Sequence, residues 1–181
     1  MRLTPAVVAL PLLFAVSAQA QDLPARKPGL WEIKMAVGGQ PLPIKDVRHC
    51  VDQSTDKMMN AALGLASLQS CSKKDVQKSG NTTVIDSVCK VGKGTNTAHT
   101  VISGNFDSAY KVHIDSKTEG GSKKGAAAAL AGENHMTIDA RYLGACERGQ
   151  KPGDIIMGGI KLNIQNMPDI NTLGALGGLL Q

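Results

Sequence analysis

Apolar and polar residues alternate with a period of two along most of the chain, which is the pattern of β-strands with one buried and one solvent-facing side. In the segment LWEIKMAV, every second residue from Trp31 to Val37 is apolar, whereas Glu32 and Lys34 are charged. The same alternation recurs later and predicts strands at residues 73–78, 82–91, 95–103, 108–116 and 135–143. The pattern therefore predicts an antiparallel sheet with one apolar and one polar face.

The apolar side of this predicted sheet supplies the candidate core. Trp31 is the only tryptophan of the chain, and the alternation places it on the same side as Ile33 and Met35. We expect its indole to be a buried anchor rather than an exposed binding platform, and removal of such an anchor costs about 3–5 kcal/mol. The predicted core anchors are Trp31, Ile33, Met35, Tyr110, Val112, Ile138 and Tyr142.

One segment breaks the alternation. Residues 52–68 (DQSTDKMMNAALGLASL) carry Ala, Leu and Met at helical spacing, with Asp52 or Ser54 as candidate caps, and therefore predict a helix. The helix follows a second strand within residues 41–50, whose prolines favour an edge position. The expected fold is mainly β, a curved antiparallel meander sheet or half-barrel of about 7–8 strands with one short helix between strands 2 and 3. One short helix is too small to cover the apolar face of this sheet, so more apolar strand positions are present than the helix can bury.

Both ends of the chain differ from the strand pattern. Residues 1–20 combine a basic start, an apolar run too short to span a bilayer and a small-x-small close, which indicates a signal peptide cleaved after Ala20. Residues 21–28 are then a linker, 29–148 a disulfide-bonded β domain and 149–181 a Gly- and Pro-rich apolar tail that we expect to be partly disordered. We expect a periplasmic or secreted protein without a transmembrane segment in its mature chain.

The four cysteines all follow the predicted leader, and their even number favours two structural disulfides in an oxidising compartment. No two are close enough for a C-x-x-C redox motif. Strands on either side of a turn at Gly80 place Cys71 and Cys89 opposite each other, which favours the pairs Cys71–Cys89 and Cys50–Cys146. The alternative pairs, Cys50–Cys71 and Cys89–Cys146, stay open.

These landmarks resemble a known family. The motif PGLWE at residues 28–32, shortly after a leader, and four cysteines of matching order and approximate spacing are similar to an exported bacterial family, the domain of unknown function numbered three-six-one-seven. The resemblance covers residues 27–146. It implies a secreted or periplasmic β-rich domain and brings no catalytic residues, because none is assigned to the family.

Charge and motifs narrow the function classes. Without the leader, the chain carries 19 basic and 15 acidic residues, and its lysines are scattered. Aromatic residues make up 3% of the chain, so a nucleic-acid surface has little support. The sequence contains neither a G-x-S-x-G elbow nor a phosphate-cradling loop before a helix. We therefore expect no catalytic residues and no cofactor.

The histidines provide the remaining candidate chemistry. His99 and His113 lie on strands that flank a predicted turn, and their spacing places both on one face. With Asp115 or Asp139 they form a candidate two-His, one-carboxylate metal site, although an exposed polar sheet face produces the same arrangement. We expect a non-catalytic exported binding or interaction module whose apolar sheet face takes a hydrophobic ligand or an envelope protein. The alternatives are a metal-binding protein or metal-assisted enzyme using His99 and His113, and a purely structural envelope protein.

Overall fold

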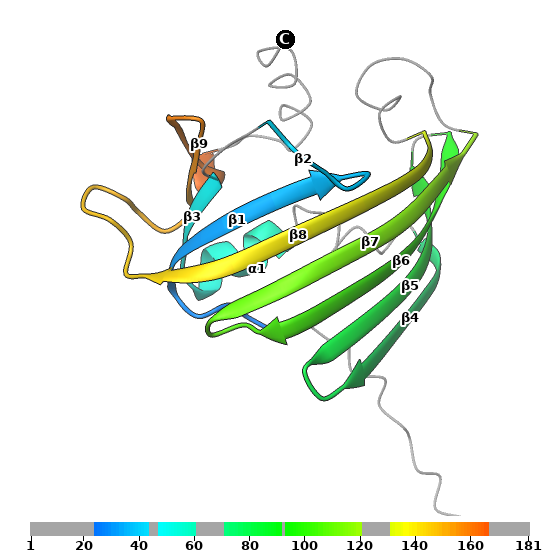
Figure 1. Ribbon diagram of the computed structural model, residues 1–181, viewed down its shortest axis with the longest axis horizontal. Helices are drawn as coiled ribbons and strands as arrows, with labels where there is room; N and C mark the ends of the chain where they lie inside the picture. Colours follow the sequence, from blue (N-terminus) through cyan, green and yellow to red (C-terminus); the bar gives the residue numbers. More distant parts are fainter. Residues whose placement is uncertain (1–23, 44–46, 61–70, 92, 121–130, 167–181) are drawn as a thin grey trace, which may run out of the picture.

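Ten β-strands form one strongly curved antiparallel sheet in the computed structural model (Figure 1), which describes residues 24–43, 47–60, 71–91, 93–120 and 131–166. The strands are β1 (Gly29–Val37), β2 (Gln40–Pro41), β3 (Val47–Val51), β4 (Cys71–Ser79), β5 (Thr82–Val91), β6 (Gly94–Asn105), β7 (Ala109–Glu119), β8 (Gly132–Gly144), β9 (Asp154–Met157) and β10 (Ile160–Asn163). They are accompanied by the helix α1 (Gln53–Asn60) and the short 3-10 helix η4 (Ile164–Asn166).

The strand order is β10-β9-β3-β1-β8-β7-β6-β5-β4, and β2 pairs with β1 off this path. Strands β4 to β8 form a meander, and the first strand, β1, then lies between β8 and β3. The end strands β4 and β10 do not pair with each other among the described residues, so the sheet is an open half-barrel rather than a closed one (Figure 1). The predicted mainly-β, curved antiparallel fold is confirmed.

The segment expected to be a tail adds strands to the sheet. Strands β9 and β10 form a hairpin around Gly158 and Gly159, whose φ angles are 57° and 83°. Positive φ at both central residues is what a two-residue hairpin turn requires, and glycine adopts it without strain. Strand β9 also pairs with β3. The strand count exceeds the expected 7–8 because β2 and β9 are too short to show a clear alternation in the sequence. Residues 167–181 lie outside the described residues.

Helix α1 begins immediately after β3. The Asp52 carboxylate accepts a hydrogen bond from the backbone N–H of Thr55 at 2.8 Å, and the Thr55 hydroxyl accepts one from the backbone N–H of Asp52 at 2.9 Å. This reciprocal pair satisfies two N–H groups at the start of the helix, so Asp52 is the cap. The predicted helix extends to residue 68, but residues 61–70 lie outside the described residues. Helix α1 lies on the concave side of the sheet, behind β1 and β8 in Figure 1.

Both disulfides connect parts of the sheet. One joins Cys71 to Cys89 across the hairpin of β4 and β5. The other joins Cys50 in β3 to Cys146, which follows β8. All four cysteines of the chain are therefore paired. Since β3 and β8 lie on opposite sides of β1, the second disulfide fixes both neighbours of the first long strand.

The concave face of the sheet, called the inner face below, carries the apolar anchors. Cross-strand pairs between β1 and β8 place Trp31 opposite Tyr142, Ile33 opposite Ala140 and Met35 opposite Ile138. Strand β7 continues these rows with Tyr110, Val112 and Ile114. The burial of these side chains is uneven. Trp31 and Ala140 are buried, whereas most of the others are only half-buried: Ile33, Met35, Tyr110, Val112, Ile114, Met136, Ile138 and Tyr142.

Candidate functional site

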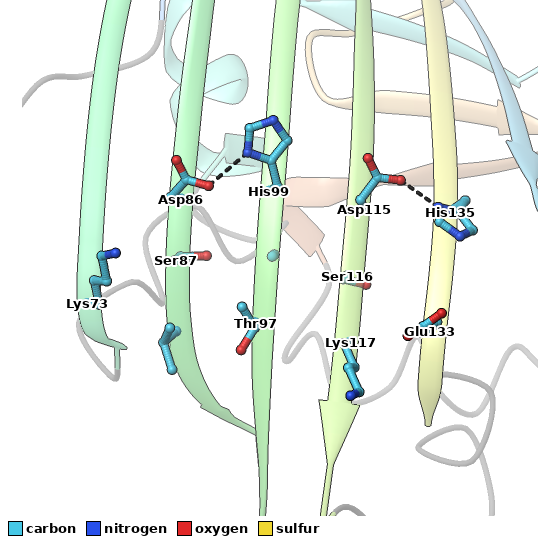
Figure 2. Close-up of a pocket in the computed structure, with 12 residues that line it drawn as sticks. Lys73, Asp86, Ser87, Thr97, His99, Asp115, Ser116, Lys117, Glu133 and His135 are labelled. Carbon is cyan, nitrogen blue, oxygen red and sulfur yellow. Dashed lines mark hydrogen bonds and ion pairs between the residues drawn. The ribbon is translucent and has the colours of Figure 1, made fainter.

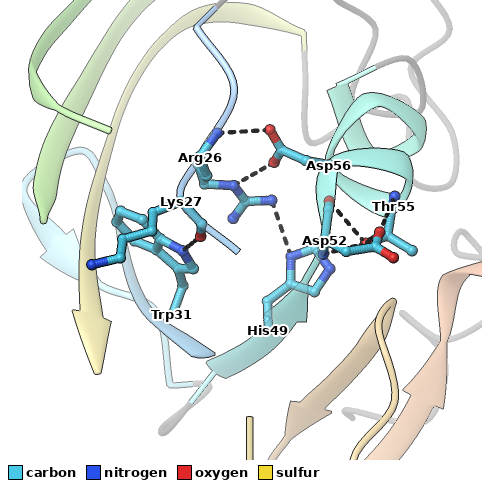
Figure 3. Close-up of polar contacts among 7 residues, drawn as sticks. All are labelled: Arg26, Lys27, Trp31, His49, Asp52, Thr55 and Asp56. Atoms are coloured by element: carbon cyan, nitrogen blue, oxygen red, sulfur yellow. Dashed lines mark hydrogen bonds and ion pairs between the residues drawn. The ribbon is translucent and has the colours of Figure 1, made fainter. Parts of the chain in front are cut away.

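A buried polar cluster lies at the end of the inner face nearest α1 (Figure 3). It consists of Arg26 from the segment before β1, His49 from β3 and Asp56 from α1, and we call it the Arg26 cluster. The Asp56 carboxylate accepts hydrogen bonds from the Arg26 side-chain Nε at 2.6 Å and from the Arg26 backbone N–H at 3.0 Å. The Arg26 guanidinium also lies 3.2 Å from His49 Nδ1. An ion pair to Asp56 and a hydrogen bond to His49 therefore connect the segment before β1 with α1 and β3, which lie more than 20 residues later in the sequence.

The Arg26 cluster fixes the protonation of His49. A guanidinium has only donors, so His49 Nδ1 accepts the hydrogen bond and the ring proton resides on Nε2. His49 Nε2 is buried without a hydrogen-bond partner in the described structure. Burial first, and then the positive charge of Arg26, lower the pKa of His49 from 6.5 to about 3. The imidazole is therefore neutral at physiological pH, and its interaction with Arg26 is that of an acceptor rather than of an ion pair.

Aromatic rings surround Trp31 beside this cluster. Its indole Nε1 donates a hydrogen bond to the backbone carbonyl of Lys27 at 2.8 Å, and its ring centroid lies 5.6 Å from those of both Tyr110 and Tyr142. The ring of Phe106 stacks on Tyr110 at 4.6 Å. Burial raises the pKa of Tyr110, and the charge of Arg26 opposes that effect. The single tryptophan is thus fully buried with its polar N–H satisfied.

The glycine before Trp31 allows close packing at this point. Gly29 has a φ of 139°, and a side-chain Cβ there would overlap the backbone carbonyl of Gly144 and the ring of Tyr142. A residue without a side chain is therefore needed where β1 enters the sheet. The Pro-Gly-Leu-Trp-Glu motif thus combines a close backbone approach at Gly29 with the anchor at Trp31.

The convex face, called the outer face below, carries an ordered row of acids and imidazoles (Figure 2). Strand pairing places Asp86 opposite His99, His99 opposite Asp115, and Asp115 opposite His135. His99 Nδ1 lies 2.8 Å from Asp86 Oδ1, and His135 Nδ1 lies 2.5 Å from Asp115 Oδ1. His113, two residues before Asp115 on β7, places its Nε2 3.3 Å from Asp115 Oδ2. We call these five residues the His–Asp row.

Four residues of the His–Asp row, all except His113, border a shallow, open depression of about 360 Å³. The side chains of His113, Asp115 and His135 are 49%, 40% and 62% exposed, so they can change rotamer freely. The hydrogen bond from His135 is the main cause of a lowered pKa at Asp115, and the charges of the nearby imidazoles add to it. Asp115 is therefore ionised and faces two imidazoles at once.

The structure places the sequence-based metal candidates in different surroundings. His99 contacts Asp86 rather than His113, and Asp139 pairs with Lys111 at 3.0 Å. Asp115 is the carboxylate that His113 contacts, and its second partner is His135. His135 was not among the candidates, because its position depends on the register of β7 against β8. Within the described ranges, no three His, Cys, Asp or Glu side chains are already arranged to hold a metal ion.

No local sequence pattern predicts the Arg26 cluster. Arg26 lies in the segment interpreted as a linker, yet it is only 6% exposed, and its partner Asp56 is 30 residues away. His49 directly precedes the disulfide-bonded Cys50, and its sequence position does not indicate that it is the buried partner of Arg26. Distant pairs of this kind have no local sequence pattern. A capped helix with an acidic residue in its first turn would have been the one available hint.

Comparisons with known proteins support the family resemblance and indicate no biochemical activity. Of the helices in the described ranges, none has the length and apolar character needed to cross a membrane. Neither the curated proteins nor the solved structures contain a match to this chain. A family model described as protein of unknown function (DUF3617) matches residues 26–146, from the arginine of the buried cluster to the last cysteine. The chain belongs to this DUF3617 family.

Proposed function

We propose that this protein is a non-catalytic binding module that works outside the cytoplasm and holds a hydrophobic ligand on the inner face of its sheet. The observation that carries the proposal is the half-burial of large apolar side chains on that face. Met35, Val112, Ile114 and Ile138 form continuous cross-strand rows, yet none of them is fully buried. A folded protein gains roughly 1.5–3 kcal/mol from fully burying each such side chain, so a ligand that covers these rows would be stabilised by the same effect.

The shape and stiffness of the sheet suit this role. Two disulfides and the Arg26 cluster fix β3, α1 and the β4–β5 hairpin, so the curvature persists without a ligand. Trp31 is the largest fully buried side chain, and the half-buried rows extend away from it along β1, β7 and β8. A preformed apolar surface binds with less loss of conformational entropy than one that must first be ordered.

Export is the second part of the proposal. The leader pattern of residues 1–20 supports it, and so do the two disulfides, because such bonds persist in oxidising compartments. The amino terminus of the isolated protein tests this directly. We expect a chain that begins after Ala20, and a full-length chain recovered from the cytoplasm would contradict export.

Native mass spectrometry of protein purified from its own cells tests the ligand. We expect a retained apolar molecule that solvent extraction releases, leaving a protein that then binds an anilinonaphthalene sulfonate dye. A partner protein that co-purifies in place of a small molecule would redirect the proposal to protein recognition. If the protein retains no ligand and binds no dye, the result would contradict a hydrophobic binding function and favour a purely structural role in the envelope.

A further inference from the structure

We propose that the outer face carries a binding site for a divalent transition-metal cation, with His113, Asp115 and His135 as its protein ligands. This site lies on the opposite face from the hydrophobic surface, so it goes beyond the function proposed above and does not depend on it. Zn²⁺ is the probe ion, because its protein sites combine imidazole and carboxylate ligands.

The backbone brings the three side chains together. His113 and Asp115 are two residues apart on β7 and therefore project from the same face, and His135 is the cross-strand partner of Asp115 on β8. Directly paired residues such as Asp115 and His135 have Cβ atoms about 5 Å apart, and diagonal neighbours such as His113 and His135 lie about 7 Å apart, which is within reach of long side chains. The central strands of the sheet thus hold three ligand-bearing positions at short, fixed separations.

The side chains already share one carboxylate. His135 Nδ1 lies 2.5 Å from Asp115 Oδ1, and His113 Nε2 lies 3.3 Å from Asp115 Oδ2. Ligand atoms around a tetrahedral Zn²⁺, at bond lengths of about 2.0–2.2 Å, lie roughly 3.3–3.5 Å from one another. The three groups are hydrogen-bonded rather than convergent as they stand. Since all three are about half exposed, small rotations exchange a shared proton for a cation, and the fourth position stays open to water.

The surrounding charges favour a cation at this point. The two lysines of β7 already have acidic partners: Lys111 lies 3.0 Å from Asp139, and Lys117 lies 2.8 Å from Glu119. His99 is held by Asp86 at 2.8 Å on the far side of Asp115. The pair His99–Asp86 therefore belongs to a neighbouring interaction, and the site consists of β7 and β8 residues.

Calorimetric titration of the untagged protein with ZnCl₂ tests the site. We expect one ion per chain with micromolar affinity, and at least a tenfold weakening in both Asp115→Asn and His135→Gln. The matched control is His99→Gln, which removes an imidazole of similar exposure from the same row and should bind as the wild type does. Circular dichroism checks that each variant folds.

A second measurement needs no variant. Labelling of imidazoles with diethyl pyrocarbonate, located by mass spectrometry, should be suppressed by Zn²⁺ at His113 and His135 and unchanged at His99. The proposal is overturned if millimolar Zn²⁺ gives no binding. Unchanged affinity in His135→Gln, or protection centred on His99, would likewise overturn it.

Discussion

The buried imidazole of His49 makes the folded protein sensitive to acid. Burial and the charge of Arg26 lower the pKa of His49 from 6.5 to about 3. In the unfolded chain the ring regains its ordinary pKa, so between these values the unfolded state binds a proton that the folded state does not. The contribution of His49 to the free energy of unfolding is therefore complete above about pH 6.5 and is lost progressively as the pH falls toward 3.

The size of this effect follows from the shift. One pKa unit corresponds to about 1.4 kcal/mol, and pH 5 lies about 1.5 units below the ordinary pKa of a histidine. We therefore expect acidification from about pH 7.5 to pH 5 to lower the free energy of unfolding by about 2 kcal/mol through His49 alone. Ordinary carboxyl groups titrate near pH 4, so this range reports mainly on imidazoles.

Urea unfolding followed by Trp31 fluorescence, with the disulfides intact, measures the effect. His49→Gln keeps an oxygen that can accept the hydrogen bond from Arg26, but it does not titrate, so its loss between the two pH values should be about 2 kcal/mol smaller than that of the wild type. The control His113→Gln removes an exposed imidazole and should keep the loss due to His49. Equal losses in His49→Gln and the wild type would refute the buried neutral imidazole.

Three further changes test the framework. Asp56→Asn breaks the buried ion pair and leaves the Arg26 charge uncompensated, so it should lower the free energy of unfolding in chemical denaturation by about 3–5 kcal/mol. A double replacement of Arg26 and Asp56 by apolar residues should lower it by less, and equal losses in the single and double variants would contradict the pairing. Trp31→Ala should cost about 3–5 kcal/mol by the same assay, and a cost below about 1 kcal/mol would contradict its role as an anchor. Replacing Cys50 and Cys146 by alanine should lower the free energy of unfolding by about 4–5 kcal/mol, because this disulfide closes a loop of 96 residues. Replacing Cys71 and Cys89 should lower it by about 3 kcal/mol, because that disulfide closes a loop of only 18 residues. The reverse order in thermal scans would contradict that reasoning.

The strands and their two faces were predictable because side-chain direction in a strand has a period of two. Glu32 and Lys34 alternate with Trp31, Ile33 and Met35 in the sequence, and the same alternation separates the two faces of β1 in the structure. The alternation of Ile160, Leu162 and Ile164 indicates β10, but its hairpin partner β9 escapes this reasoning, since four residues contain only two repeats. Their hairpin depends on Gly158 and Gly159, and glycines in an apolar segment are equally typical of a disordered tail.

The polar sites depend on contacts that a local pattern does not contain. Arg26 and Asp56 meet only because α1 returns over the inner face after β3. His135 joins Asp115 only through the register of β7 and β8, which is not fixed by either strand alone. The sequence therefore identified histidines on the polar face but selected His99 with His113, whereas the structure groups His113 with His135 around one carboxylate.

Titration of ligand-free protein with a fluorescent fatty acid analogue, in two neighbouring variants of β1, tests the central claim most directly. Met35→Gln makes the inner face more polar at nearly constant volume, whereas Lys34→Gln changes the adjacent side chain, which is 73% exposed on the outer face. We expect Met35→Gln to weaken binding about tenfold and Lys34→Gln to leave it unchanged. Equal affinities in the two variants, or no binding by the wild type, would contradict a hydrophobic binding surface on the inner face of the sheet.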